Sequence, residues 1–196
     1  MRSLDGGDDL LEAALGASES RDTESRTRIA DLGRRLNLAL AQRVQDLSRY
    51  RSDFFGQLRE ILADRDDIRI VGDRFVFQSE VLFSAGDAEV ADAGLADLNA
   101  LANAIKQLET QIPPEIPWVL RIDGHTDKRP IKTARFPSNW ELSASRAISV
   151  AKYLVDQGIS PTRLVAAGFG EFQPIDPGDT DEAYRRNRRI EFKLTD

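Results

Sequence analysis

An acid and an arginine flank a polar loop, and their side-chain types suit a ligand that carries two opposite charges. Asp127 follows an apolar run that ends at Ile122, and Arg146 lies in the helical pattern that comes next. A carboxylate can bind an ammonium group, whereas a guanidinium offers a planar fork of donors that matches a carboxylate in bidentate fashion. The pair therefore fits a small zwitterionic group. A plain salt bridge between the two side chains is the alternative.

Catalytic and metal-binding chemistry finds little support in the same segment. Asp123, His125 and Asp127 alternate as metal ligands can, but His125 is the only histidine, and short runs of this kind commonly serve turns. No G-x-S-x-G motif accompanies the imidazole, which argues against a Ser-His-Asp hydrolase. The absence of cysteine excludes disulfides, thiolate metal sites and cysteine nucleophiles. We therefore expect no enzyme activity, no metal and no cofactor.

Composition narrows the choice of partners and of cellular location. The net charge of -6 argues against sequence-independent binding of nucleic acid, which needs a basic face to displace counterions. No run approaches the roughly 20 apolar residues that span a bilayer. The first residues are acidic and lack the apolar stretch of an export signal. We expect the chain as written to need a further segment for export.

The chain divides into three expected segments: a polar, disordered or frayed stretch over 1–26, a long amphipathic helix over 27–66, and an α+β domain over 67–196. The apolar stripe of the helix comprises Ile29, Leu32, Leu36, Leu40, Val44, Leu47, Tyr50, Phe54, Leu58 and Ile61. Its nine steps cover 32 residues, a mean of 3.56 per step, which is the period of an α-helix but does not decide the handedness of a coiled coil. The stripe needs a partner: its own copy, another chain, or the following domain.

In the domain, strands are expected at 75–77, 81–83, 118–122, 164–169 and 189–194, and helices at 90–108, 142–157 and 181–187. Because helices alternate with strands, the helices should pack on one face of a small mixed sheet. Trp140 and Phe169 are expected in the core. Asn187 should cap the last helix or tie it to the sheet.

Three separated motifs in this domain, GHTD, SNWELSxxRA and NRRIEF, resemble the OmpA-like C-terminal peptidoglycan-binding domain family, and within it the MotB flagellar stator subgroup. The resemblance covers roughly residues 70–196 and implies a β-α-β-α-β-α-β fold. It also implies that Asp127 meets the ammonium and Arg146 the carboxylate of the diaminopimelate residue in the peptidoglycan stem peptide. Thr126, Asn139 and Leu142 would flank that site. One of Arg186, Arg188 and Arg189 is expected to face it as well.

The function implied is non-catalytic: the domain would bind peptidoglycan in the periplasm and anchor a membrane-associated assembly to the cell wall. A homodimer would form through the N-terminal helix. A membrane segment absent from this sequence would connect the chain to a channel or motor subunit. The alternative is a scaffold or adaptor in which the helix carries the function and the domain does not bind the wall.

Overall fold

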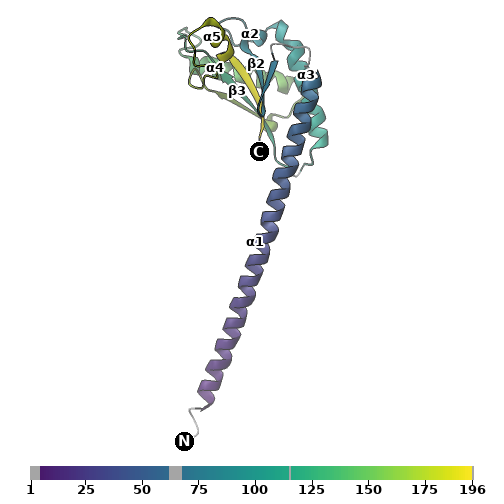
Figure 1. Ribbon diagram of the computed structural model, residues 1–196, viewed down its shortest axis with the longest axis vertical. Helices are drawn as coiled ribbons and strands as arrows, with labels where there is room; N and C mark the ends of the chain where they lie inside the picture. The colour runs from purple at the N-terminus through teal and green to yellow at the C-terminus, as the bar shows by residue number, and fades with distance from the viewer. Residues whose placement is uncertain (1–4, 62–67, 115, 196) are drawn as a thin grey trace. The chain divides into compact units, whose positions relative to one another are not determined.

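The computed structural model describes residues 5–61, 68–114 and 116–195. They form two compact units, Met1–Asp46 and Leu47–Asp196. Among the described residues, no helix is both long and apolar enough to cross a membrane. The elements in chain order (Figure 1) are α1 (Asp5–Ile61), β1 (Ile68–Val71), β2 (Arg74–Gln78), α2 (Ser79–Leu82), α3 (Asp92–Gln111), β3 (Val119–His125), α4 (Asn139–Asp156), the 3-10 turn η1 (Pro161–Arg163), β4 (Leu164–Gly168), α5 (Asp181–Asn187) and β5 (Arg189–Thr195).

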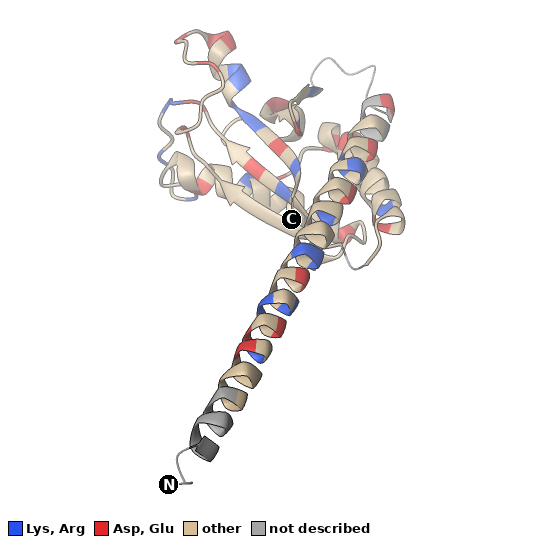
Figure 2. Cartoon of the chain, turned by 60° about the horizontal axis from the view of Figure 1, so that its bottom comes forward, with Lys and Arg blue, Asp and Glu red and all other residues tan. Residues whose placement is uncertain are grey.

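The first unit consists of the N-terminal part of α1. The helix begins at Asp5, whereas the sequence predicted a disordered or frayed segment over 1–26. Alanine, leucine and glutamate, which favour helix, are frequent there. Ion pairs one turn apart add support, with Arg26 at 2.9 Å from Asp22 and Arg28 at 2.8 Å from Glu24. Figure 2 shows acidic and basic residues interspersed along α1.

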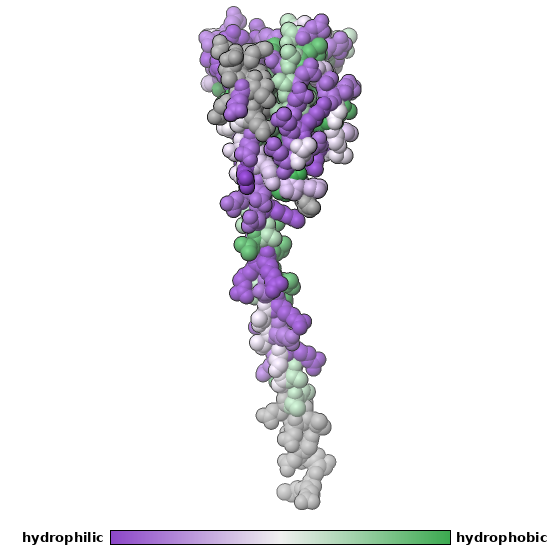
Figure 3. All heavy atoms as spheres, turned by 90° about the vertical axis from the view of Figure 1, so that its right-hand side faces the viewer, coloured by the Kyte–Doolittle hydropathy of each residue, from purple (hydrophilic) through white to green (hydrophobic). Residues whose placement is uncertain are grey.

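The apolar stripe of α1 is exposed in the first unit and packed in the second. The exposed residues, 49% to 69% accessible, are Ile29, Leu32, Leu36, Leu40 and Val44. Figure 3 shows apolar side chains exposed along α1. In the second unit, Leu47 and Tyr50 pack against the core, and Phe54 is fully buried. The following domain therefore accounts for one end of the stripe. The side chains of Leu58 and Ile61, and the expected boundary at 66/67, lie outside the described residues.

The second unit contains a five-stranded sheet in the order β1-β2-β5-β3-β4. The pair β3–β4 is parallel and the other three pairs are antiparallel, so the predicted mixed sheet is confirmed. The strand β1 was not predicted. It forms a hairpin with β2 in which Val71 pairs with Arg74 around a Gly72-Asp73 turn, and Gly72 has a positive φ of 62°.

One face of the sheet carries the core and the other carries charged side chains. Core residues occupy alternate strand positions, as in Leu120 and Ile122 of β3, and they pack with α3, α4 and the buried end of α1. The intervening residues of β3, such as Asp123, face the other way and lie opposite Glu191 of β5. The predicted arrangement, with helices on one face of the sheet, is therefore confirmed.

The strand expected at 81–83 is wrong. The β2–β5 ladder ends where the Ser79 amide donates to the Arg188 carbonyl at 2.9 Å. The chain then turns away from the sheet as the short helix α2, and Phe83 makes only an isolated bridge to Val90. The apolar run is present because Leu82 and Phe83 are buried, and burial alone does not distinguish a strand from a helical turn.

Candidate functional site

The N-terminal half of α4 and the end of β3 bring the predicted site residues to one place. Asn139, Leu142 and Arg146 stand at steps of three and four on α4, which places them on one helical face. Ser138 caps this helix: its Oγ accepts a hydrogen bond from the Trp140 amide at 3.2 Å. On the facing side, the chain leaves β3 through Thr126.

Two glycines allow α4 to approach the strands closely. A Cβ added at Gly124 of β3 would lie 2.1 Å from the backbone oxygen of Ser143. One added at Gly168 of β4 would lie 2.5 Å from the amide nitrogen of Ala144. Both distances are shorter than any side chain tolerates, so the helix that carries Arg146 is seated directly on the backbone of the sheet.

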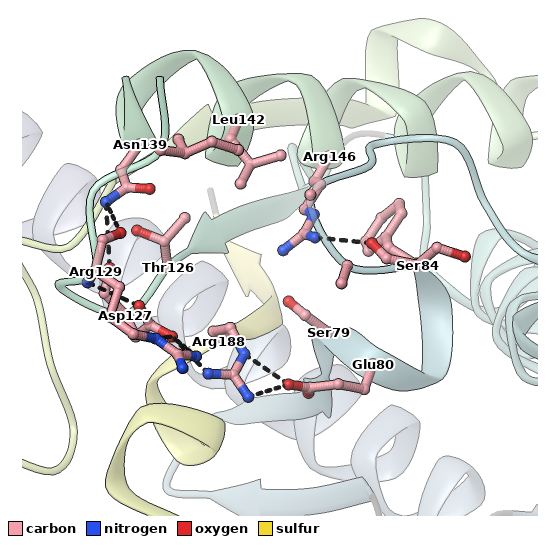
Figure 4. Close-up of a pocket in the computed structure, with 14 residues that line it drawn as sticks. Ser79, Glu80, Ser84, Thr126, Asp127, Arg129, Asn139, Leu142, Arg146 and Arg188 are labelled. Atoms are coloured by element: carbon pink, nitrogen blue, oxygen red, sulfur yellow. Dashed lines mark hydrogen bonds and ion pairs between the residues drawn. The ribbon is translucent and has the colours of Figure 1, made fainter. Parts of the chain in front are cut away.

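A pocket of about 400 Å³ lies between these elements (Figure 4). All five predicted residues line it: Thr126, Asp127, Asn139, Leu142 and Arg146. Arg188, one of the three arginines that the sequence offered, lines it as well. Sequence reasoning did not find the rest of the wall, which consists of Ser79, Glu80, Phe83, Ser84, Ala85, Gly86, Arg129 and Ile131. Six of these belong to α2 and the turn that follows it, which carry no recognisable motif.

Arg146 is a buried cation at one end of the pocket, only 4% exposed. Its Nε donates to the Asp87 carbonyl at 2.7 Å and its Nη2 to the Ser84 carbonyl at 3.3 Å. Its guanidinium lies over the Phe83 ring, 5.1 Å from the centroid. Among the described residues, no carboxylate lies within ion-pair distance of it. Burial lowers the pKa of Arg146 to about 10, so the group stays charged at neutral pH.

Asp127 lies at the other end of the pocket and is held by two arginines. Its Oδ2 accepts from Arg129 Nη2 at 2.7 Å and from Arg188 Nη1 at 2.5 Å. Burial alone would raise the pKa of Asp127, but the hydrogen bonds from Arg129 and Arg188 outweigh it and hold the pKa below its usual value. Asp127 and Arg146 do not pair with each other, so the plain salt bridge between them is absent.

Of the three candidate arginines near the C-terminus, Arg188 faces the pocket, and it also donates to Glu80 Oε1 at 2.6 Å. Arg186 pairs with Asp176 at 2.7 Å. Arg189 is buried and pairs with Glu191.

Asn187 was expected to cap the last helix or to tie it to the sheet. It instead fixes the preceding loop: its Oδ1 accepts from the amides of Ile175 and Asp176, and its Nδ2 donates to the Asp176 carbonyl at 2.7 Å.

Two hydroxyl groups in the pocket wall have no partner among the described residues. They are Ser79 Oγ and Thr126 Oγ1, and both are shielded from solvent. Figure 4 shows Arg146, Ser79 and Thr126 around the cavity, with Asp127 beyond Thr126. Asn139 ties the loop to the helix, because its Nδ2 donates to the carbonyls of Asp127 and Arg129. The arrangement offers a desolvated cation, free hydroxyls and a carboxylate, which together suit a small zwitterion.

The structure groups Asp123 and His125 with Glu191 on the charged face of the sheet, and Asp127 is not part of this group. Both carboxylates are already paired: Asp123 with Arg121 at 2.7 Å, and Glu191 with Arg74 and Arg189 at 2.5 and 2.6 Å. Three guanidinium groups around two carboxylates repel a further cation, so the grouping does not favour a metal.

The aromatic residues near the site differ from expectation. The prediction that Trp140 lies in the core is wrong, because its side chain is 49% exposed. It follows Asn139 in the first turn of α4, where a step of one residue rotates the side chain away from the pocket face. Phe169 is half-buried and lies outside the core, with its ring stacked on His125 at 4.9 Å between centroids.

Comparison with known proteins gives a consistent picture. The model of the OmpA family matches residues 82–188. The uncharacterized protein YtxE of Bacillus subtilis is 38% identical over 136 residues, which are 69% of this chain and 52% of that protein. Motility protein B of the same organism is 34% identical over 119 residues, 58% of this chain and 44% of that protein. The chain thus spans about half the length of the curated relatives it matches.

Solved structures extend the comparison to the fold. A putative MotB-like protein from Desulfovibrio vulgaris superposes with a TM-score of 0.65 at 30% identity, over 76% of this chain and 96% of that one. The cell wall anchor of the T6SS from Pseudomonas aeruginosa superposes with a TM-score of 0.61 at 29% identity, over 70% of this chain and 95% of that one.

Proposed function

Because this chain belongs to the OmpA family, we propose that its second unit binds peptidoglycan without catalysis, through the diaminopimelate residue of the stem peptide. The observation that carries the proposal is Arg146, a buried guanidinium that has no carboxylate within ion-pair distance among the described residues. A buried cation without a counter-ion is costly, and a ligand carboxylate would offset that cost.

The end of a diaminopimelate side chain carries an ammonium and a carboxylate on one carbon. Arg146 uses two of its five donors on backbone carbonyls, and the remaining donors can receive the ligand carboxylate. Thr126 and Ser79 supply hydroxyls between the two ends. Asp127 would take the ammonium once Arg129, which is 54% exposed, moves aside, while Arg188 keeps its bond to Oδ2. Asn139 and Leu142 shape the wall.

The proposal has a second part: the domain anchors an assembly to the wall, and α1 serves as its helical stalk. The first unit supports this part. The exposed stripe of α1, from Ile29 to Val44, would pair with the stripe of a second copy. We propose the segment limits that the sequence predicted: a stalk over 27–66 and a wall-binding domain over 67–196. The chain would act in the periplasm and hold a membrane-associated channel, motor or tether to the wall. Its similarity to a motility protein and to a cell wall anchor supports such a role.

The alternative remains a scaffold whose helix carries the function and whose domain does not bind the wall. The same exposed stripe favours it, because the stripe suits a protein partner whether or not the pocket is used.

Co-sedimentation with purified diaminopimelate-type sacculi tests the proposal. The parent chain, Asp127→Ala and Arg146→Ala are compared with two matched controls. Asp176→Ala removes an aspartate that also pairs with an arginine and accepts a backbone amide, that of Gly178. Arg163→Ala removes an arginine that also lies over an aromatic ring and donates to a carbonyl, both of Trp118.

Binding by the parent and the controls, but not by folded pocket variants, would establish the site. Sacculi of the lysine type should bind more weakly, since a lysine end offers Arg146 no carboxylate. A folded parent that does not sediment with either kind of sacculi would leave the scaffold as the function.

A further inference from the structure

Trp140 and Phe172 form an exposed aromatic pair beside the pocket. Their ring centroids lie 5.2 Å apart with an interplanar angle of 30°. The side chain of Trp140 is 49% exposed and that of Phe172 is 60% exposed. Single exposed apolar residues are common and need no explanation, but two large rings packed together in solvent form a ready binding surface.

The pair is held rigidly to the wall of the pocket. Ser143 links the two segments that carry the rings: its Oγ donates to the Trp140 carbonyl at 3.0 Å and accepts from the Gly170 amide at 3.0 Å. The Gly170 carbonyl accepts from the amide of Thr126, a pocket residue, at 2.9 Å. Trp140 itself directly follows Asn139, another pocket residue, so their Cα atoms are about 3.8 Å apart.

The turn that presents Phe172 also has a defined conformation. Gly170 has a φ of +55°, in the left-handed region, and a Cβ there would meet the Phe172 ring at 3.3 Å. The Phe172 amide donates to the Phe169 carbonyl at 3.3 Å. The ring is therefore placed by a tight turn between β4 and α5. A surface fixed in this way loses little conformational entropy when a ligand binds.

We propose that Trp140 and Phe172 form a second subsite that stacks against a sugar ring of the glycan strand. The inference rests on the proposed function, since it extends the same ligand beyond its peptide. The face of a pyranose ring presents C–H groups, which pack by dispersion on the electron-rich face of an aromatic ring. The hydroxyl and acetamido groups at the rim of the sugar remain in water, which suits a half-exposed platform.

The covalent structure of the polymer links the two groups that the subsites would bind. In peptidoglycan, diaminopimelate is the third residue of a peptide attached to the muramic acid ring. Three residues span at most roughly 10 Å. The stem peptide therefore limits how far a sugar can lie from the peptide that is seated in the pocket. A wall segment can occupy both subsites at once. Because the sugar and the peptide belong to one molecule, the second contact forms without a further loss of the ligand's translational freedom.

The probe for the test is a preparation of peptide-free glycan strands, alternating N-acetylglucosamine and N-acetylmuramic acid with all stem peptides removed. Intrinsic fluorescence reports on the platform, because Trp118, the other tryptophan, is only 2% exposed. We expect the glycan to change the Trp140 emission and to protect it from a soluble quencher. Trp140→Ala and Phe172→Ala should each weaken glycan binding, measured by calorimetry, roughly tenfold.

Further variants separate stacking from structural damage. Trp140→Phe keeps an aromatic face and should retain binding within about threefold. Ile148→Ala removes another half-exposed apolar side chain of α4, 45% accessible, and should leave binding unchanged. A free diaminopimelate tripeptide should bind the parent and Trp140→Ala equally well, whereas Asp127→Ala should lose the tripeptide and keep the glycan.

Four results would overturn the inference. Glycan binding that is equal in the parent and in Trp140→Ala would place the sugar elsewhere. A parent that binds the tripeptide but not the glycan would remove the second subsite and leave the proposed function intact. A change of sedimentation coefficient in Trp140→Ala without ligand would assign the pair to self-association. A parent that binds neither probe would contradict the proposed function as well.

Discussion

Arg129 encloses Asp127 from two sides: its backbone amide donates to Oδ1 at 2.8 Å, and its side-chain Nη2 donates to Oδ2 at 2.7 Å. An internal cation thus occupies the position where the ligand ammonium is proposed to bind. The backbone bond orients the carboxylate, whereas the side-chain bond competes with the ligand. Arg129 also lies over the Tyr184 ring, 5.0 Å from its centroid, a contact that it makes at the same time as the bond to Asp127.

Replacing Arg129 should therefore tighten the binding of a diaminopimelate peptide. Arg129→Ala keeps the backbone bond and removes one of the two guanidinium groups on Oδ2, while Arg188 keeps the other bond. Exposed ion pairs contribute at most about 1 kcal/mol, so the expected gain is up to about fivefold in affinity, measured by calorimetry. Lys128→Ala is the control, because Lys128 pairs with Asp179 and does not contact Asp127. Weaker binding by Arg129→Ala would show instead that Arg129 contacts the ligand.

Arg146→Lys should weaken peptide binding at least roughly tenfold, although it keeps the charge. Lysine lacks the planar fork that satisfies the carbonyls of Asp87 and Ser84 while facing a carboxylate. An unpaired buried carbonyl costs about 1–3 kcal/mol, so thermal unfolding should also shift downward. Arg163→Lys is the matched control for the unfolding measurement. Unchanged affinity in folded Arg146→Lys would mean that only the charge matters.

His125 makes stability depend on pH in a defined window. Burial lowers its pKa to about 4, whereas the unfolded chain titrates near 6.5. Below 6.5 the unfolded state takes up the proton first. The stabilisation is therefore complete above pH 6.5 and is lost progressively as the pH falls to about 4, by roughly 3 kcal/mol in total. Urea unfolding at several pH values should show this slope, and His125→Gln should show a smaller one, since carboxylates such as Asp127 still lose stability toward the acid end.

Because the chain has one histidine, a single imidazole resonance in a proton NMR titration reads the pKa directly. A midpoint near 6.5 in the folded protein would refute the pH argument. Both ring nitrogens of His125 also lack a hydrogen-bond partner among the described residues.

Sequence periodicity predicted most of the elements because their burial is regular. The apolar residues of β5 alternate and those of α4 recur at helical spacing. The start of α4 was predicted three residues late, at 142, because the cap at Ser138 was not recognised. GHTD and SNWELSxxRA located five of the fourteen residues that line the pocket. The part contributed by α2 and the turn after it was not predictable. That turn holds Arg146 through the carbonyls of Ser84 and Asp87, and every residue type has a carbonyl.

The sequence did not determine which of the three C-terminal arginines faces the pocket, and the reason is different. Arg186, Arg188 and Arg189 lie within four residues, at the junction of α5 and β5. Which one faces the pocket depends on the residue at which the strand begins, and helix and strand ends are the least predictable features of a sequence. The strand begins at Arg189, so Arg188 is the residue left to face Asp127.

Gly124→Ala should weaken both stability and binding. The added methyl group would lie 2.1 Å from the Ser143 carbonyl oxygen, so α4 must move, and with it Arg146. Overpacking of this kind typically costs about 1–3 kcal/mol, to be measured by thermal and urea unfolding. Gly33→Ala in α1 is the contrasting control, because nothing lies within 4 Å of its added Cβ. That variant should gain up to about 1 kcal/mol of helix stability. A fully stable Gly124→Ala that binds normally would contradict the close seating of α4.

The stripe of α1 makes a separate prediction about self-association. If two copies pair through it, Leu36→Asp should convert a dimer into a monomer, because a charge placed on a buried seam lacks a partner. Leu38→Asp provides a matched control in the same helix: Leu38 is 71% exposed, but a step of two residues from Leu36 places it on another face. Sedimentation equilibrium measures the molecular mass of the parent and of both variants, and so shows which of them are dimers.

A parent that is monomeric throughout, or equal dissociation in both variants, would exclude the stripe as the dimer seam. The stripe would then suit a different protein as its partner. The result also bears on wall binding, because two pockets on one dimer can hold the same sacculus together. The parent should therefore sediment with sacculi more tightly than Leu36→Asp, while both bind a free diaminopimelate peptide equally. Equal sedimentation of a proven dimer and a proven monomer would show that each domain binds the wall independently.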